Sequence, residues 1–253
     1  MIGMSCTHFG TKMPEEVLNS LVGKFDLWEI FSEAEHSIVY HTDLFQDLLP
    51  TYDMNYTVHS PICDLNIAAI SDRLREASVR EIAATAIAAN KLDIGMMVVH
   101  PGLSSMAVNG TEEVAAERAK WAMTFLEKVS DEYGVSLAIE NMPEMKFFLG
   151  RTADQLARII DGTNLSVCLD IGHANTTGQL DELVEKLGDR IVHVHVHDNH
   201  GETDEHLTLG EGNIDFKDAL SKINDYDGDF IIESRTLESA IESQKTLDGL
   251  IYE

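Results

Sequence analysis

The sequence predicts a (β/α)8 barrel, because of its length, the alternation of its elements and the polar residues that end its apolar runs. With 253 residues, the chain can form one such barrel or two small domains. Short apolar runs alternate with longer segments of helical period along the chain. No linker rich in proline or serine divides it, so we expect a single domain over residues 1–253.

Eight apolar runs have the length of β-strands. They are Ile2–Cys6, Leu27–Phe31, Tyr56–His59, Met96–His100, Ser136–Glu140, Ser166–Asp170, Ile191–His195 and Phe230–Glu233. Eight βα units in this length are what a (β/α)8 barrel requires, whereas a doubly wound sheet rarely needs eight strands.

Helical periods fill the segments between these runs. The clearest cover Asn66–Lys91, Thr111–Tyr133, Thr152–Ile160 and Asp215–Tyr226. The second of them opens with threonine and has Glu112 and Glu113 in its first turn, which is typical of a helix N-terminus. Gly134, Gly162 and Gly188 stand where helix-to-strand connections should turn.

The chain is strongly acidic, with 18 Lys and Arg residues against 44 Asp and Glu residues and a formal net charge of −26. Such a surface repels phosphate groups, so a membrane is not expected as a partner and a nucleic acid is disfavoured. A cytoplasm of high salt content would explain the same charge without any reference to the substrate.

The cysteines and the N-terminus indicate a cytoplasmic protein. Cys6, Cys63 and Cys168 are far apart and odd in number, which argues for a reducing compartment. The opening MIGMSCTHFG lacks the pattern of a secretory signal. No apolar run reaches the roughly 18–20 residues that a membrane span needs.

Residues that are costly to bury fall at the C-terminal ends of the predicted strands or just beyond them. They are His59, His100, Glu140, Asp170, His173, His195, Asp204, His206 and Glu233. Barrels of this fold build their active sites at that face. Converging carboxylates and imidazoles are neutralised most simply by divalent cations, and this mixture suits Zn²⁺ or Mn²⁺ better than Ca²⁺. We therefore expect a metal site, without an organic cofactor.

Seven motifs in these regions resemble the xylose isomerase-like superfamily. They are VHSPICDLN, VVHPG, IEN, LDIGHA, HVHD, DEHLTLGEGNIDF and IIES. They occur in order over nearly the whole chain, and the set that includes DxHxxLGEGNI is specific. The superfamily includes sugar-phosphate isomerases and epimerases and the family 2 AP endonucleases, such as endonuclease IV.

The resemblance implies one to three divalent ions per chain. A one-ion design like that of the isomerases and epimerases would place its ligands at Glu140, Asp170, His195 and Glu233. A three-ion design like that of endonuclease IV would let Glu140 bridge two ions. It would add five further ligands, at His59, His100, His173, Asp204 and His206. All nine positions carry the residue types of the three-ion design.

Three other features favour the one-ion design. The chain is short for a protein with loops that enter DNA. The segment FSEAEHSIVY after the second strand is acidic. Ile62 also stands where the nuclease pattern looks aromatic. Against a close match to the sugar epimerases, no arginine occurs between Arg190 and Arg235.

We therefore expect an isomerase or epimerase of a small carbohydrate, with Glu140 and Glu233 transferring a proton through an enediolate. The alternative is a Zn²⁺-dependent phosphodiesterase that acts at abasic sites in DNA. A third hypothesis is a catalytically silent metal-binding barrel. An oligomer is compatible with the sequence.

The seventh strand presents three histidines on one face, His193, His195 and His197. The resemblance of H-x-H-D to the family motif assigns the ligand to His195, although this assignment could be off by two residues. His197 is then expected to contact the substrate, together with His173 and His8. Gly210 and Gly212 are expected to shape the turn that presents Asp204 and His206.

Overall fold

Eight parallel strands form a closed barrel, in which each strand pairs with its neighbours in sequence and β8 pairs with β1. The computed structural model describes residues 1–251. The strands are β1 (Ile2–Ser5), β2 (Leu27–Phe31), β3 (Asn55–His59), β4 (Met96–Val99), β5 (Ser136–Glu140), β6 (Ser166–Asp170), β7 (Ile191–Val196) and β8 (Asp229–Glu233). The predicted (β/α)8 fold is confirmed, and no strand end differs from its predicted position by more than one residue.

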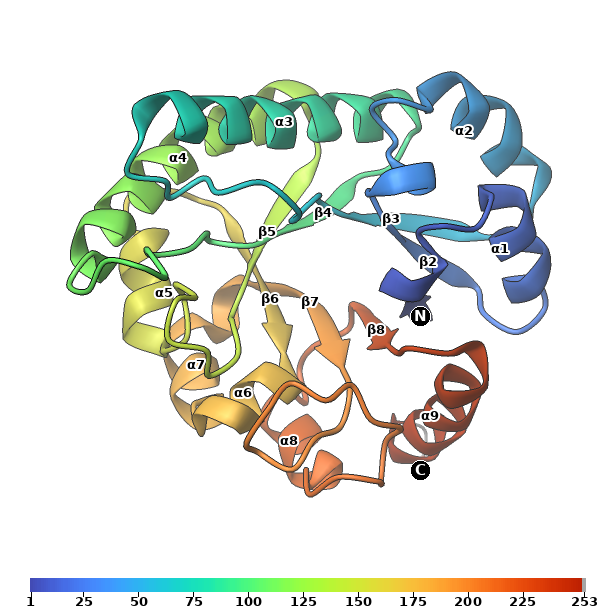
Figure 1. Ribbon diagram of the computed structural model, residues 1–253. Helices are drawn as coiled ribbons and strands as arrows, with labels where there is room; N and C mark the ends of the chain where they lie inside the picture. The colour runs from blue at the N-terminus through green and yellow to red at the C-terminus, as the bar shows by residue number, and fades with distance from the viewer. Residues whose placement is uncertain (252–253) are drawn as a thin grey trace.

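Helices surround the barrel and cover the outer side of its strands (Figure 1). They are α1 (Pro14–Leu21), α2 (Thr42–Leu48), α3 (Asp72–Lys91), α4 (Glu112–Tyr133), α5 (Ala153–Ile159), α6 (Ile171–Thr177), α7 (Leu180–Leu187), α8 (Phe216–Lys222) and α9 (Leu237–Ile251). Because all the strands are parallel, their C-terminal ends open into loops on one rim of the barrel. Within residues 1–251, no helix combines the length and the apolar character that crossing a bilayer requires.

Two helices are shorter than predicted. The helix expected from Asn66 begins at Asp72, because the Asn66 side chain accepts a hydrogen bond from the backbone N–H of Leu103 (2.9 Å) and holds this segment against the loop after β4. The helix expected to reach Tyr226 ends at Lys222. The Tyr226 hydroxyl instead donates to the backbone carbonyl at the start of β8 (2.6 Å).

The three glycines expected at turns behave differently from one another. Gly134 and Gly162 have left-handed φ values of 66° and 82°, which favour glycine. Gly188 has a φ of −51° and begins a 3-10 turn, so its position does not require glycine for conformational reasons.

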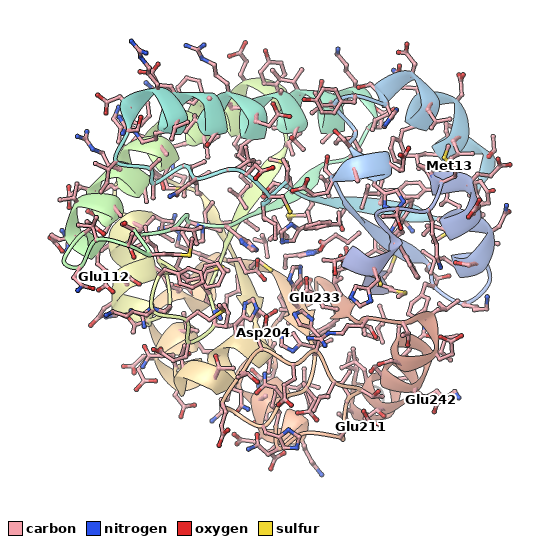
Figure 2. All side chains as sticks on the ribbon, in the orientation of Figure 1. Met13, Glu112, Asp204, Glu211, Glu233 and Glu242 are labelled. Carbon is pink, nitrogen blue, oxygen red and sulfur yellow. The ribbon has the colours of Figure 1, made fainter. Side chains whose placement is uncertain are left out.

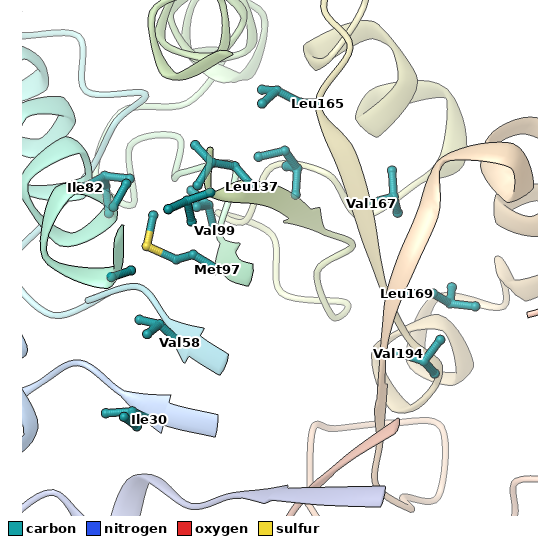
Figure 3. Packing of buried hydrophobic residues seen from close by; sticks show 14 of the residues in the cluster. Ile30, Val58, Ile82, Met97, Val99, Leu137, Leu165, Val167, Leu169 and Val194 are labelled. Carbon is teal, nitrogen blue, oxygen red and sulfur yellow. The ribbon is translucent and has the colours of Figure 1, made fainter. Parts of the chain in front are cut away.

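Successive strand residues face two different layers. The outward-facing residues pack against the helices in one large apolar core, part of which is shown in Figure 3 with Ile30, Val58, Met97 and Leu137 near Ile82 of α3. Burial of this apolar surface is the main driving force for holding the helices on the barrel.

The inward-facing residues form a small apolar floor beneath a polar layer. Val98, Ala138 and Cys168, from three adjacent strands, make up a separate apolar cluster inside the barrel. Two residues further along β5 and β6, at the same face by the period of a strand, stand Glu140 and Asp170. The barrel interior therefore supports the candidate site from below.

Gly3 of β1 lies in the barrel interior, where the neighbouring side chains leave no space for a larger residue. A Cβ at this position would lie 2.7 Å from Cγ of Leu27 and 2.8 Å from Cδ1 of Ile231. We expect Gly3→Ala to lower the free energy of unfolding by about 1–3 kcal/mol through overpacking, measured by chemical denaturation. The control is Gly95→Ala, where a Cβ would meet no atom within 4 Å. Equal losses in the two variants would contradict the prediction.

Candidate metal centre

The nine residues selected from the sequence lie together at the C-terminal rim, where Figure 2 shows Glu233 and Asp204 near the middle of the molecule. Their nitrogen and oxygen atoms form three groups, and within each group the atoms lie within 4.8 Å of one another. The first group is His59, His100 and Glu140; the second is Glu140, Asp170, His195 and Glu233; the third is His173, His197, Asp204 and His206.

Glu140, the last residue of β5, belongs to the first two groups. Its Oε2 lies 2.9 Å from Nε2 of His100 and 3.5 Å from Nε2 of His59. Its Oε1 lies 3.0 Å from Nδ1 of His195. The side chain is buried, so its two oxygens face different imidazoles in a space without bulk water. A carboxylate in this position can bridge two cations.

The second group surrounds Nδ1 of His195 on β7. Oε1 of Glu233 lies 3.3 Å from this nitrogen, and Oδ2 of Asp170 lies 3.9 Å from it. With Glu140, the group offers three carboxylates and one imidazole. This is a donor set that binds Zn²⁺ or Mn²⁺.

Asp204 lies at the centre of the third group. Nε2 of His206 is 3.1 Å from its Oδ2, and Nε2 of His173 is 3.4 Å from the same oxygen. Nε2 of His197 is 3.3 Å from its Oδ1. His206 has a φ of 52°, a left-handed conformation that is uncommon outside glycine.

Hydrogen bonds to backbone carbonyls determine which ring nitrogen of His59 and of His173 faces the candidate metal site. Nδ1 of His59 donates to the carbonyl of Ser60, and Nδ1 of His173 donates to the carbonyl of Asn141, each at a distance of 2.8 Å. A neutral imidazole with its proton on Nδ1 has a free lone pair on Nε2. Nε2 is the atom that each of these residues directs into its group.

Asn141 also ties the ends of two strands together. Its side-chain oxygen accepts from the backbone N–H of Asp170 (2.8 Å), and its amide donates to the Asp170 carbonyl (2.9 Å). Asp170 in turn accepts from the backbone N–H of His173 (2.6 Å) and caps α6. The motifs IEN and LDIGHA therefore form one connected unit.

Asp198 of the HVHD motif shapes the loop that carries the third group. Its buried carboxylate accepts hydrogen bonds from the backbone N–H groups of Asn199, Gly210 and Gly212, each at 2.9 Å. It also accepts one from the backbone N–H of Ile214 at 3.2 Å. A Cβ on Gly212 would lie 2.3 Å from Oδ1 of Asp198, and Gly210 has a φ of 95°. The expectation that these two glycines shape the turn is confirmed.

Glu29 of β2 belongs to the same environment, although the sequence analysis did not select it. Its Oε2 accepts from Nε2 of His193 (2.8 Å) and from the Thr57 hydroxyl (3.1 Å), and its Oε1 lies 3.1 Å from Nε2 of His195. Burial by itself would raise the pKa of Glu29, but His195 and His193 outweigh burial and lower that pKa below its usual range. In the sequence, the position of this carboxylate within the apolar run LWEIF is the feature that could have indicated its role in the site.

The residues expected to contact a substrate are placed differently. His8 is exposed on a 3-10 turn (Thr7–Phe9) after β1 and belongs to none of the three groups. Its role in substrate binding stays a prediction. His173 and His197 are buried within the third group.

The carboxylates hold protons on the surrounding imidazoles. Burial would lower the pKa of His173, but Asp170 and Asp204 raise it well above its ordinary value. Burial likewise opposes protonation of His206, and Asp204 together with Glu233 raises its pKa to about 9. These protons supply the positive charge that a bound cation would supply in their place.

Unpartnered buried atoms show that the residues fit such cations. Oε2 of Glu140, Oδ2 of Asp170, Oδ1 of Asp204 and both ring nitrogens of His197 have no hydrogen-bond partner. Leaving one buried polar atom unsatisfied costs about 1–3 kcal/mol. A divalent ion in each group would satisfy the three carboxylate oxygens at once.

Several known proteins are similar to this chain. An uncharacterized protein of Methanocaldococcus jannaschii is 36% identical over 249 residues, which cover 93% of this chain and 85% of that protein. A probable endonuclease 4 of Acholeplasma laidlawii is 30% identical over 193 residues, or 68% of this chain and 63% of that protein. The solved structure of a D-tagatose 3-epimerase-like protein matches with a TM-score of 0.90 and 32% identity, over 99% of this chain and 97% of the other.

The family model for the xylose isomerase-like TIM barrel matches residues 23–250. This range includes all nine candidate ligands and seven of the eight strands. The chain therefore belongs to the xylose isomerase-like TIM-barrel family.

Proposed function

We propose that this protein hydrolyses a phosphate ester at a centre of three divalent cations. The observation that carries this proposal is the position of Glu140, whose two oxygens face two different sets of imidazoles. A single ion in the second group would leave His59 and His100, and the separate group around Asp204, without a cation.

The charge of the centre also supports a phosphate ester. Its ligands include four carboxylates, Glu140, Asp170, Asp204 and Glu233. Three divalent ions bring six positive charges against these four negative ones and leave a net charge of two positive, which attracts an anion. One divalent ion would leave two negative charges on these four ligands, so a one-ion centre attracts an anionic substrate less strongly than a three-ion centre does.

The chain's own residues would orient the cations and the substrate. The first and second groups would hold two ions on either side of Glu140, and the third group would hold the remaining one. When bound, the two ions beside Glu140 would supply Lewis-acid stabilisation of the charge that develops on the phosphate oxygens. Glu29 would keep the His195 ring oriented through its contact with Nε2.

The surroundings of the centre favour a small ester over duplex DNA. A pocket of about 160 Å³ between the loops that follow β3 and β4 includes His100 of the first group. Its lining, which lies within the described residues, is largely apolar, with Ile62, Leu103 and Phe148, and has no lysine or arginine. Phosphate contacts by basic residues supply much of the affinity for DNA, so this surface disfavours that substrate.

Epimerisation of a small carbohydrate is the second candidate. The likeness to the D-tagatose 3-epimerase-like protein favours it, together with the convergence of Glu140 and Glu233 on one imidazole. In that case the second group would hold the ion, and the two carboxylates would exchange a proton with the substrate carbon.

Metal content is the first prediction from the proposed function. We expect the protein loaded with Zn²⁺ to hold three ions per chain and Glu140→Gln to hold at most two, because Gln cannot bridge two cations as a carboxylate does. Elemental analysis after dialysis measures this, with Glu202→Gln as the control because Glu202 is exposed in the loop after β7. One ion per wild-type chain would contradict the three-cation centre.

The pH dependence of metal binding is the second prediction. Since the pKa of His206 is raised to about 9, its imidazole is protonated at pH 7 before a cation arrives. Binding at pH 7 should therefore release protons, and the apparent Zn²⁺ affinity should increase between pH 7 and pH 9. Calorimetric titration in buffers of different ionisation enthalpy measures both effects. A heat that does not depend on the buffer would show that no proton is displaced.

Substrate turnover separates the two candidate functions. We expect the Zn²⁺-loaded protein to release phosphate or alcohol from small phosphate esters, and Glu140→Gln to lose at least about 100-fold in kcat/KM, the upper range for groups that merely support a ligand. A panel of sugar phosphates, a nitrophenyl diester and an abasic duplex measures this. Incorporation of solvent deuterium into a neutral sugar, lost in Glu233→Gln and without ester cleavage, would instead support the epimerase.

A further inference from the structure

His197, which directly follows β7, is fully buried, and neither of its ring nitrogens has a hydrogen-bond partner. Its Nε2 lies 3.3 Å from Oδ1 of Asp204 and 3.3 Å from Oδ1 of Asp170, without forming a hydrogen bond to either. Oδ1 of Asp170 is already occupied by the backbone N–H of His173. A buried imidazole in this condition is unfavourable unless something binds it.

The ring of His197 is fixed between two neighbours. It stacks on the ring of His206, with centroids 4.1 Å apart and planes at 17°. It also lies so close to Gly172 that a Cβ there would come within 2.1–2.5 Å of three ring atoms. The ring therefore has no open face toward a substrate, which argues against the substrate-binding role expected from the sequence.

The nitrogen of His197 lies among the ligand atoms of the third group, which are all within 4.8 Å of one another. Nε2 atoms of His173, His197 and His206 lie 3.1–3.4 Å from the Asp204 oxygens. Zinc bonds of about 2.0–2.1 Å in a tetrahedron place neighbouring ligand atoms about 3.3 Å apart. The three distances from the imidazole nitrogens to Asp204 are close to this value.

We propose that His197 is the fourth protein ligand of the third cation, which makes this site a closed one with three imidazoles and one carboxylate. A site with four protein ligands has no open position for substrate or water and acts structurally. Here it would hold the loop of residues 199–214 on the barrel, because Asp204 and His206 belong to that loop while His173 and His197 belong to the barrel side. The proposal rests on the three-cation centre, but not on the reaction performed there.

The test compares the stepwise Zn²⁺ affinities of the metal-free wild type, of His197→Gln and of Asp204→Asn by titration against a chromophoric chelator. We expect His197→Gln to weaken the binding of one of the three ions. The loss of affinity should exceed the factor of about 10 to 100 that is typical when a supporting group is lost. The other two ions should keep their affinities. Asp204→Asn should weaken the same ion. His200→Gln is the matched control, because this histidine is exposed in the same loop.

Two further readouts distinguish a ligand from a packing residue. Replacing Zn²⁺ by Co²⁺ should give an intense visible absorption from the four-coordinate site, and His197→Gln should lose that component. In the wild type, proteolysis within residues 199–214 should slow when the third ion is added, which keeps the proposal testable even if His197→Gln fails to fold. The proposal would be overturned if His197→Gln left the Zn²⁺ affinities and the Co²⁺ spectrum unchanged. It would also be overturned if the rate of proteolysis of the loop did not depend on the metal.

The outcome separates this inference from the proposed function. Loss of one ion in His197→Gln, without ester hydrolysis by the wild type, would support the closed site and contradict the hydrolase. Ester hydrolysis with three ions unaffected by His197→Gln would support the hydrolase and contradict the closed site.

Discussion

A carboxylate can be buried inside a closed barrel only where positive groups face it, and the arrangement of the candidate site follows from this requirement. Glu29, Glu140 and Asp170 are buried on β2, β5 and β6, and their partners come mostly from other strands. The desolvation penalty of one such ion is several kcal/mol, so removing a partner leaves an uncompensated charge. His193 and His195 of β7 meet this requirement for Glu29, and His195 also meets it for Glu140. The register of β7 in the barrel therefore determines the geometry of the site.

The site combines strand ends with one long loop. The first two groups stand on strand ends and on the residues directly after them, whose backbones are fixed by the barrel. The third group is partly built on a loop, and Asp198 compensates for this by binding four backbone N–H groups of that loop. A cation on Asp204 would add a second anchor, so the loop would depend on both the carboxylate of Asp198 and the metal.

The number of cations links the chemistry to the substrate. Families built on one barrel can change their reaction by changing residues at the rim while the strands remain the same. In this chain two divalent ions would only neutralise the four carboxylate ligands, whereas a third ion would make the centre positive toward a phosphate. A strongly acidic surface with a formal net charge of −26 can therefore coexist with an anionic substrate, provided that the positive charge is concentrated in the centre.

The sequence by itself determined the eight strands, the rim that carries the site and the nine residues gathered there. Strand periodicity and the C-terminal position of each polar residue are local properties, and parallel strands bring such positions to one rim whatever the loops do. Only the tertiary structure decided that Glu140 faces two sets of imidazoles, that Glu29 supports His195, and that His197 turns into the third group. These depend on side-chain directions and on contacts between distant strands, such as Glu29 with His193, for which one sequence holds no local signal. The start of α3 at Asp72 was hidden for the same reason, because Asn66 is held by a loop that lies far along the chain.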